Sequence, residues 1–180
     1  MLTCRISVRN CSDVTLLSDF VFRQLEEHTE SMRLALTAIV PRRSKDEATE
    51  RLLAEYVERA GRYVPCESQV FGTETALLEW LDRQAGRSPA YAILLDSRGQ
   101  QFSSEEIAAL VGRLRDESTQ RLVFAIGPAD GWSKVARQRA NIVLSLGRIT
   151  LPHQLARVVL AEQVYRALTI LAGHPYHSGH

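Results

Sequence analysis

The chain has 180 residues, of which 45% are hydrophobic and 24% are charged, and its formal net charge is +1. This ordinary globular composition fits one domain with or without an extension, and it excludes a strongly basic chain whose overall charge would bind nucleic acid. Three cysteines lack disulfide or metal-site spacing and no apolar run approaches the ~20 residues of a membrane span, so we expect a cytoplasmic, metal-free protein with no membrane association.

Strands and helices alternate along most of the chain. Buried-type strands are expected at residues 34–40, 91–95, 122–126 and 142–146, with a weaker one at 66–71. Between them we expect helices at 46–62, at 73–84, from Ser103 onward and after Trp132, and one last helix that starts at Pro152 and stops at Gly173. This alternation predicts an α/β fold with a mainly parallel sheet and helices on both of its faces.

The last helix is apolar around almost its whole circumference. A surface helix shows one apolar stripe, so this helix is expected to pack against its own sheet and a second subunit, which predicts a homodimer. Three charges nevertheless lie within it, namely Arg157, Glu162 and Arg166. Glu162 and Arg166 are four residues apart and can pair, and charges on a nearly buried helix need a partner or a function.

The same residues carry a family resemblance. The pattern Pro-His-Gln-x-x-Arg-Val-x-Leu-x-Glu-Gln-x-Tyr-Arg-Ala begins at Pro152, and His-Pro-Tyr-His ends at His177. It resembles the C-terminal signature of the ribosomal RNA large subunit methyltransferase H family, which belongs to the SPOUT methyltransferases. The resemblance implies a C-terminal trefoil knot and a homodimer. It also implies methyl transfer from S-adenosylmethionine to N3 of a pseudouridine in large-subunit (23S) rRNA, free or in the assembled ribosome.

The resemblance starts at Met32, which places the SPOUT domain at residues 32–180. Residues 1–31 have no counterpart in the family, and they contain a possible strand at 2–8 and a possible helix at 13–28. Two interpretations stay open: a genuine appended element, or translation that starts at Met32. The intact mass of the native protein distinguishes them.

Three loops are candidates for the cofactor site. Leu94–Gly99 and Ile126–Gly131 follow strands, and ligands of parallel sheets bind beyond the carboxyl ends of strands, although ordinary turns would have the same composition. In the family both loops and the segment before the last helix line the S-adenosylmethionine site. The cofactor residues implied are Leu95, Gly127, Pro128, Gly147, Arg148, Ile149, Thr150, Leu151 and Pro152.

Four features depart from the family pattern. Pro128 replaces the second of two glycines and has no N–H, and Gly147 replaces a serine. A basic run is missing after Phe71, and the tail continues with Ser178 in place of arginine, so weaker RNA binding is expected. These changes favour an alternative, a catalytically impaired relative that binds ribosomes or a nucleoside. The residues expected to contact RNA are Arg42, Arg43, Lys45 and Arg157.

The reaction requires N3–H to lose its proton, so a base or a group that stabilises the developing anion is needed. The candidate catalytic residues are Glu162, Arg166 and His177, and their individual roles stay open. His153 is either a locally satisfied histidine or part of the site. His174, His177 and His180 lack Cys or carboxylate partners at ligand spacing, so no metal site is expected.

Overall fold

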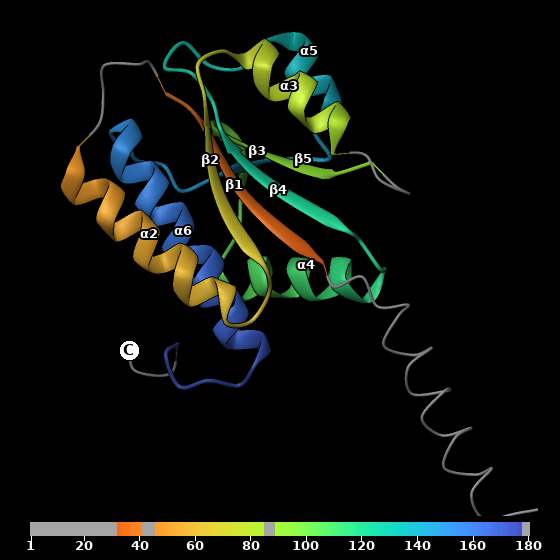
Figure 1. Cartoon of the computed structure of the whole chain (residues 1–180), viewed down its shortest axis with the longest axis vertical. Helices are drawn as coiled ribbons and strands as arrows, with labels where there is room; N and C mark the ends of the chain where they lie inside the picture. Colours follow the sequence, from red (N-terminus) through yellow and green to blue (C-terminus); the bar gives the residue numbers. More distant parts are fainter. Residues whose placement is uncertain (1–31, 41–45, 85–88, 178–180) are drawn as a thin grey trace, which may run out of the picture. The chain divides into compact units, whose positions relative to one another are not determined.

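A computed structural model describes residues 32–40, 46–84 and 89–177. Five strands form one sheet in the order β2-β1-β4-β3-β5, and every pairing is parallel (Figure 1). The possible elements within residues 1–31 lie outside the described residues. The strands are β1 (Arg33–Ile39), β2 (Cys66–Phe71), β3 (Tyr91–Gln101), β4 (Arg121–Ile126) and β5 (Ile142–Ser145).

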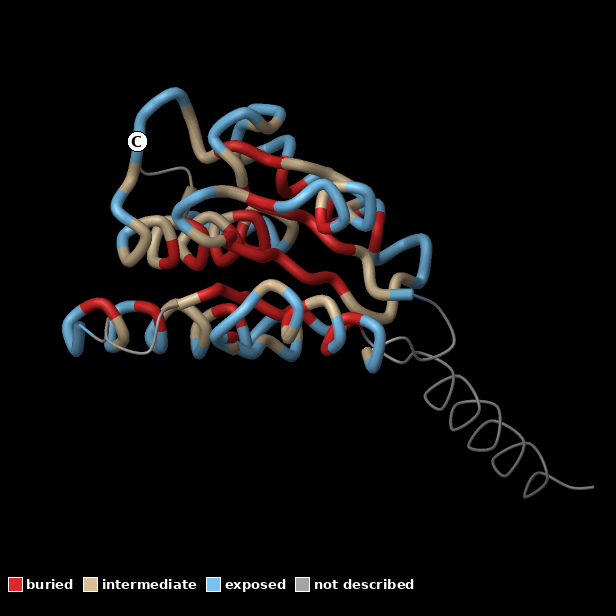
Figure 2. The backbone as a smooth tube through the Cα atoms, turned by 90° about the horizontal axis from the view of Figure 1, so that it is seen from above, coloured by how far each residue is buried: buried red, intermediate tan, exposed pale blue. Residues whose placement is uncertain are grey.

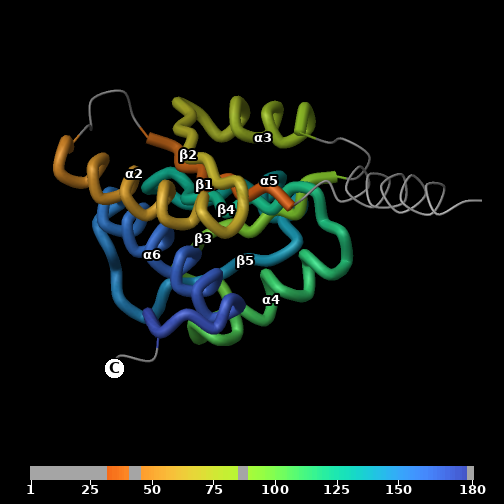
Figure 3. Tube along the Cα trace, turned by 60° about the horizontal axis from the view of Figure 1, so that its bottom comes forward, coloured from red at the N-terminus to blue at the C-terminus, as the bar shows by residue number. Residues whose placement is uncertain are grey.

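Helices cover both faces of the sheet, each with its own apolar cluster (Figure 3). On one face α2 (Glu47–Gly61), α4 (Ser104–Asp116) and α6 (His153–Leu171) enclose the larger cluster. On the other face α3 (Glu74–Arg83) and α5 (Lys134–Arg139) enclose the smaller one. The predicted α/β architecture is therefore confirmed, with a sheet that is wholly parallel among the described strands.

Burial explains which strands were easy to predict. β1 and β4 lie inside the sheet, and almost every residue of both is buried (Figure 2). Their sequences are accordingly continuous apolar runs. β2 lies at an edge, where Glu67, Ser68 and Val70 are exposed, so its pattern in the sequence is weak.

β3 is longer than expected, because it continues past Leu95 to Gln101 and pairs again with β5 after an irregularity between Leu95 and Gln100. The expectation that the strand ends at Leu95 and is followed by a loop to Gly99 is wrong. Gly99 is required by a close approach: a Cβ at this position would lie 2.6 Å from the carbonyl carbon of Leu144. This extension of β3 forms part of the site described below.

α6 finds most of its packing surface within its own chain. It lies against α2 and α4 and beneath the sheet, and Leu160, Ala161, Val164 and Leu168 are buried. A second subunit is therefore not needed to cover most of this helix, and the homodimer stays a prediction. The helix begins one residue later than expected, since Pro152 is its N-cap with extended ψ and His153 is its first residue.

Two helices end in the same hydrogen-bonded motif. After α6, the N–H of His174 donates to Thr169 and that of Gly173 to Ile170, with Gly173 at φ 65°. After α4, Thr119 donates to Leu114 and Ser118 to Arg115, with Ser118 at φ 59°. Both are Schellman motifs, in which the left-handed position favours glycine. α6 has glycine there, whereas α4 has a serine whose Cβ is strained.

We expect Ser118→Gly to raise the free energy of unfolding by about 0.5–1 kcal/mol, because it removes that strain at a modest entropic cost. Gly173→Ala should lower it by a similar amount for the converse reason. Urea unfolding of both variants and the parent measures the difference. A destabilised Ser118→Gly variant would contradict the explanation.

Candidate functional site

A pocket opens where the carboxyl ends of β3, β4 and β5 meet. Its volume is about 160 Å³, and the ends of two strands, the β3 extension, the loop before α6 and the first turn of α6 all contribute to it. This is the position at which open parallel sheets bind ligands. The residues lining it are Leu95, Asp96, Ser97, Ile126, Ser145, Leu146, Gly147, Ile149, Thr150, Leu151 and Ala156.

Five of the nine expected cofactor residues line this pocket. They are Leu95, Gly147, Ile149, Thr150 and Leu151. The other four do not line it: Gly127, Arg148 and Pro152 are each next in sequence to a lining residue, and Pro128 lies two positions after Ile126. The ring of Pro128 therefore does not fill the space beneath the loop.

Six lining residues were absent from that expected set, although Asp96, Ser97 and Ile126 lie within the two candidate loops. Asp96 and Ser97 belong to the β3 extension, which the sequence pattern did not reveal. Position at a strand end was a usable signal for Ile126, Ser145 and Leu146. The helical spacing of the first turn of α6 was a usable signal for Ala156.

The loop before α6 is shaped by Ser145 and Gly147. The buried Ser145 Oγ lies 2.8 Å from the Gly147 carbonyl oxygen and 3.2 Å from its nitrogen. Gly147 has φ 128°, a conformation that a side chain would strain, and a Cβ there would meet nothing within 4 Å. The chain therefore turns tightly at Gly147, with open space beside its backbone.

Asp96 is the ionised group of the pocket wall. Its side chain is only 6% exposed and lies 2.5 Å from Nη2 of Arg137, which extends from α5. Burial alone would raise the pKa of Asp96, but the backbone N–H of Arg98 and the guanidinium of Arg137 outweigh burial and hold this pKa below its ordinary value. The ion pair joins the β3 extension to α5.

Because the folded-state pKa of Asp96 is depressed, its stabilising contribution is complete above the unfolded pKa of about 4 and is lost as the pH falls below it. We expect Asp96→Asn to be less stable than the parent at pH 7, and the difference to shrink at pH ~3. Urea unfolding at both pH values checks this. Asp82→Asn, which weakens the exposed pair between Asp82 of α3 and Arg139 of α5, should change little. An equal loss at both pH values would refute the assignment.

The three expected catalytic residues form one cluster near the end of α6. Oε1 of Glu162 accepts hydrogen bonds from Nε of Arg166 at 2.9 Å and from the hydroxyl of Tyr176 at 3.1 Å. Nη1 of Arg166 lies 3.5 Å from Nδ1 of His177, and Nε2 of His177 lies 2.8 Å from Glu105. The tail is thereby joined to both α6 and α4.

The carboxylate of Glu162 is fully engaged in this cluster. Its second oxygen accepts from Gln163 at 2.6 Å, and the guanidinium of Arg166 also lies over the ring of Tyr176. Burial and the neighbouring carboxylate raise the pKa of Tyr176, so its phenol stays a donor. Along α6, Glu162 and Arg166 lie about 9 and 15 Å beyond Ala156 of the pocket, at 1.5 Å per residue. The cluster and the pocket are therefore separate parts of one helix.

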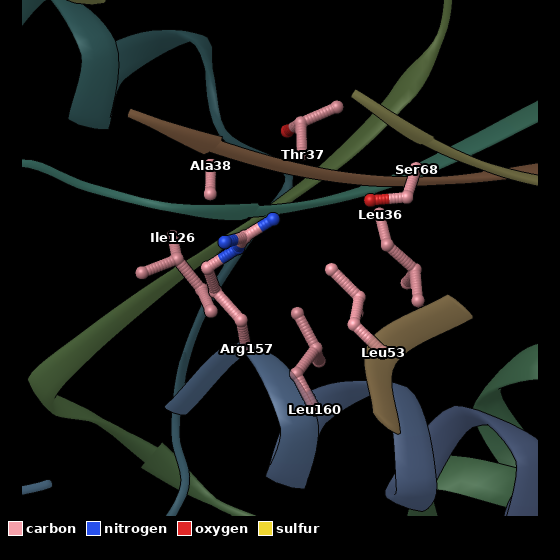
Figure 4. Close-up of a pocket in the computed structure, with 8 residues that line it drawn as sticks. All are labelled: Leu36, Thr37, Ala38, Leu53, Ser68, Ile126, Arg157 and Leu160. Carbon is pink, nitrogen blue, oxygen red and sulfur yellow. The ribbon is translucent and has the colours of Figure 1, made fainter. Parts of the chain in front are cut away.

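The residues expected to contact RNA differ in where they lie. Arg42, Arg43 and Lys45 are outside the described residues. Arg157 is 4% exposed and pairs with Glu50 of α2 at 2.5 Å. It extends from α6 toward Ala38 of β1 and beside a cavity of about 10 Å³ (Figure 4). Its guanidinium therefore faces the interior of the protein.

The described parts of the chain were expected to hold no metal site and no membrane span. Within them, no cluster of three or more His, Cys, Asp or Glu side chains is arranged to hold a metal ion. Nor does any helix there combine the length and the apolar character that crossing a membrane requires.

Comparison with known proteins identifies the family. The family model described as "Predicted SPOUT methyltransferase" matches residues 32–177. The chain belongs to the SPOUT methyltransferase family. This confirms the resemblance recognised in the C-terminal signature, and the match includes the pocket, α6 and the tail.

Similar SPOUT chains include proteins named ribosomal RNA large subunit methyltransferase H. That of Koribacter versatilis is 51% identical over 138 residues, covering 77% of this chain and 94% of the relative. That of Brucella ovis is 57% identical over 88 residues, covering 49% of this chain and 52% of the relative. Among solved structures, a probable methyltransferase from Bordetella pertussis Tohama I aligns with a TM-score of 0.49 at 14% identity, over 81% of this chain and 99% of that one.

Proposed function

We propose that this chain transfers a methyl group from S-adenosylmethionine to N3 of a pseudouridine in large-subunit rRNA. The observation that carries the proposal is the pocket at the carboxyl ends of β3, β4 and β5, built from segments that the family uses for this cofactor. The names of the similar proteins from Koribacter and Brucella support an rRNA substrate. Such a substrate implies action in the cytoplasm.

The residues of the pocket fit the cofactor. Leu95, Ile126 and Leu151 give it apolar walls for an adenine ring, and open space beside Gly147 leaves room for backbone groups of the loop to meet its polar edge. Asp96 is an ionised carboxylate in a pocket that has to accept a cationic ligand. We assign the cofactor contacts to Leu95, to Gly127 and Pro128 beside it, and to the loop from Gly147 to Pro152.

S-adenosylmethionine supplies a methyl group that is already activated by the sulfonium, so positioning provides much of the rate. The chain has to hold the target base against the pocket and stabilise the negative charge that develops as N3 loses its proton. We assign the first role to Arg166, held in place by Glu162 and close to His177, because its guanidinium can bind a phosphate of the target nucleotide at a distance from the pocket. The target nucleotide would then lie between the pocket and this cluster.

We also propose the family's quaternary and topological features for this chain. Ile149 and Leu155 are 71% and 51% exposed at the loop and the first turns of α6, an apolar surface suited to a second subunit. Sedimentation at micromolar concentration should give the mass of a dimer. The trefoil knot and a domain boundary at residue 32 belong to the same proposal, supported by the family match over residues 32–177.

Calorimetric titration of the full chain with S-adenosylmethionine, followed by a methyl-transfer assay, tests the function. Large-subunit particles from cells that lack the modification are the substrate, and mass spectrometry of nucleosides detects the product. Binding together with N3-methylpseudouridine is the expected result. Binding without transfer to particles or free rRNA would favour the non-catalytic alternative, and absence of binding would overturn the cofactor assignment.

A further inference from the structure

The segments around the pocket are not joined by sheet hydrogen bonds alone. The ladder between β3 and β4 ends at the pair Leu95 and Ile126, and the two chains continue beyond it as separate pocket segments. Past this point, side chains have to fix their relative positions. Two ring nitrogens, one from Trp132 and one from His153, make the hydrogen bonds that do so.

Trp132 lies between the end of β3 and the end of β4. Its indole Nε1–H donates to the carbonyl of Leu95 at 2.9 Å, and the side chain is 6% exposed. The same ring covers Gly127 so closely that a Cβ there would lie 2.7 Å from Cε2 of the indole. Trp132 therefore sets the separation between Leu95 and Gly127, and glycine is required at 127 by this contact.

His153 of α6 holds the chain at Gly127 from a second side. It is the first residue of α6, directly after the loop from Gly147 to Pro152, and its Nε2 lies 3.1 Å from the Gly127 carbonyl oxygen. Burial and the nearby Arg157 lower the pKa of His153 against the opposing effect of this hydrogen bond, so the ring is neutral at pH 7. Since a carbonyl only accepts, Nε2 carries the proton.

Pro128 makes the orientation of the preceding peptide depend on the contact between His153 and the Gly127 carbonyl. The peptide between Gly127 and Pro128 has no N–H, so its carbonyl is its only hydrogen-bonding group. That carbonyl is held by His153. The orientation of the peptide therefore depends on His153, and this segment contributes shape rather than an amide donor to the pocket.

We propose that His153 and Trp132 are positioning residues for the methyl donor, which hold the Gly127–Pro128 peptide and the Leu95 carbonyl in the geometry of the bound state. The proposal rests on the cofactor assignment made above. Because Pro128 leaves the peptide without an N–H, the histidine performs the ordering that a second hydrogen bond of the peptide would provide.

Calorimetric titration of full-length variants with S-adenosylmethionine tests the proposal. His153→Ala should weaken binding about tenfold, the cost of one neutral hydrogen bond of about 1.4 kcal/mol. His153→Gln, whose amide N–H extends to the position of Nε2–H, should restore most of the affinity. Trp132→Phe keeps an aromatic ring but loses the donor, and should weaken binding severalfold. His174→Ala and Trp80→Phe are matched controls that leave the hydrogen bonds to the Leu95 and Gly127 carbonyls intact, and parental affinity is expected for both.

Equal affinity of the parent, His153→Ala and Trp132→Phe would overturn the positioning role while leaving the cofactor assignment intact. A His153→Gln variant that binds as weakly as His153→Ala would also overturn it, because the ring volume and not the hydrogen bond would then be responsible. If His153→Ala does not fold, His153→Gln and Trp132→Phe still decide the question. A parent chain that fails to bind S-adenosylmethionine would instead refute the proposed function.

Discussion

Replacing Arg166 with alanine should lower the rate of methyl transfer to large-subunit rRNA by about 100-fold, because the target base is then no longer held in line with the methyl group. The affinity for S-adenosylmethionine should stay nearly unchanged, because Arg166 lies about 15 Å along α6 from the pocket residue Ala156. The expected kinetic signature is a lower kcat with an unaltered cofactor dissociation constant. Single-turnover methylation and calorimetry on the same preparation measure both quantities.

Two further variants separate chemistry from structure. Glu162→Gln keeps the shape of the side chain but loses the charge that orients Arg166, so an intermediate fall in rate is expected. Arg113→Ala is the matched control, since Arg113 forms an exposed pair with Glu117 at the same spacing on α4. Undiminished turnover in Arg166→Ala would remove this residue from the catalytic assignment. A parallel loss in the Arg113 variant would show that the effect is not specific.

The architecture was accessible from the sequence because local signals and tertiary packing agree. Continuous apolar runs became the inner strands, and Ser103 and Glu106 form the capping box that their spacing predicts. The extension of β3 was not accessible, because residues 96–101 are mostly polar and pair only with β5. Nothing local marks such a segment as a strand, since its pairing depends on a partner more than 40 residues away.

The site was predictable to the extent that strand ends determine it. Leu95 could be placed at one edge of a parallel sheet from its position at a strand end, whereas the loop from Gly147 to Leu151 was assigned to the site by the family resemblance. The hydrogen bonds that hold this edge of the sheet together could not be predicted from the sequence. The bond from Trp132 to Leu95 and that from His153 to Gly127 join residues 37 and 26 positions apart, and periodicity carries no information about such pairs.

Arg157 shows the same limit most clearly, and removing the charge of its partner gives the second large effect. Its partner Glu50 lies 107 positions earlier, so the sequence offered a free cation where the structure has a buried ion pair. Glu50→Gln should lower the free energy of unfolding by about 2 kcal/mol, because it leaves a guanidinium buried without its counter-charge. The full cost of a broken buried pair is larger, but water reaches Glu50, which is 40% exposed.

Arg157→Met separates a structural role from an RNA contact. Methionine fills similar volume without charge, and replacing a buried pair by apolar side chains is often neutral, so we expect near-parental stability in the double variant with Glu50→Gln. The RNA affinity of this double variant should depend on salt concentration as the parental affinity does. We propose that the exposed side chain of Arg148 contacts an RNA phosphate while the backbone of its loop contacts the cofactor, so Arg148→Met should instead reduce the slope of log affinity against log salt by about one. If Arg157→Met rather than Arg148→Met flattens that slope, Arg157 contacts phosphate and its burial is relieved when RNA binds.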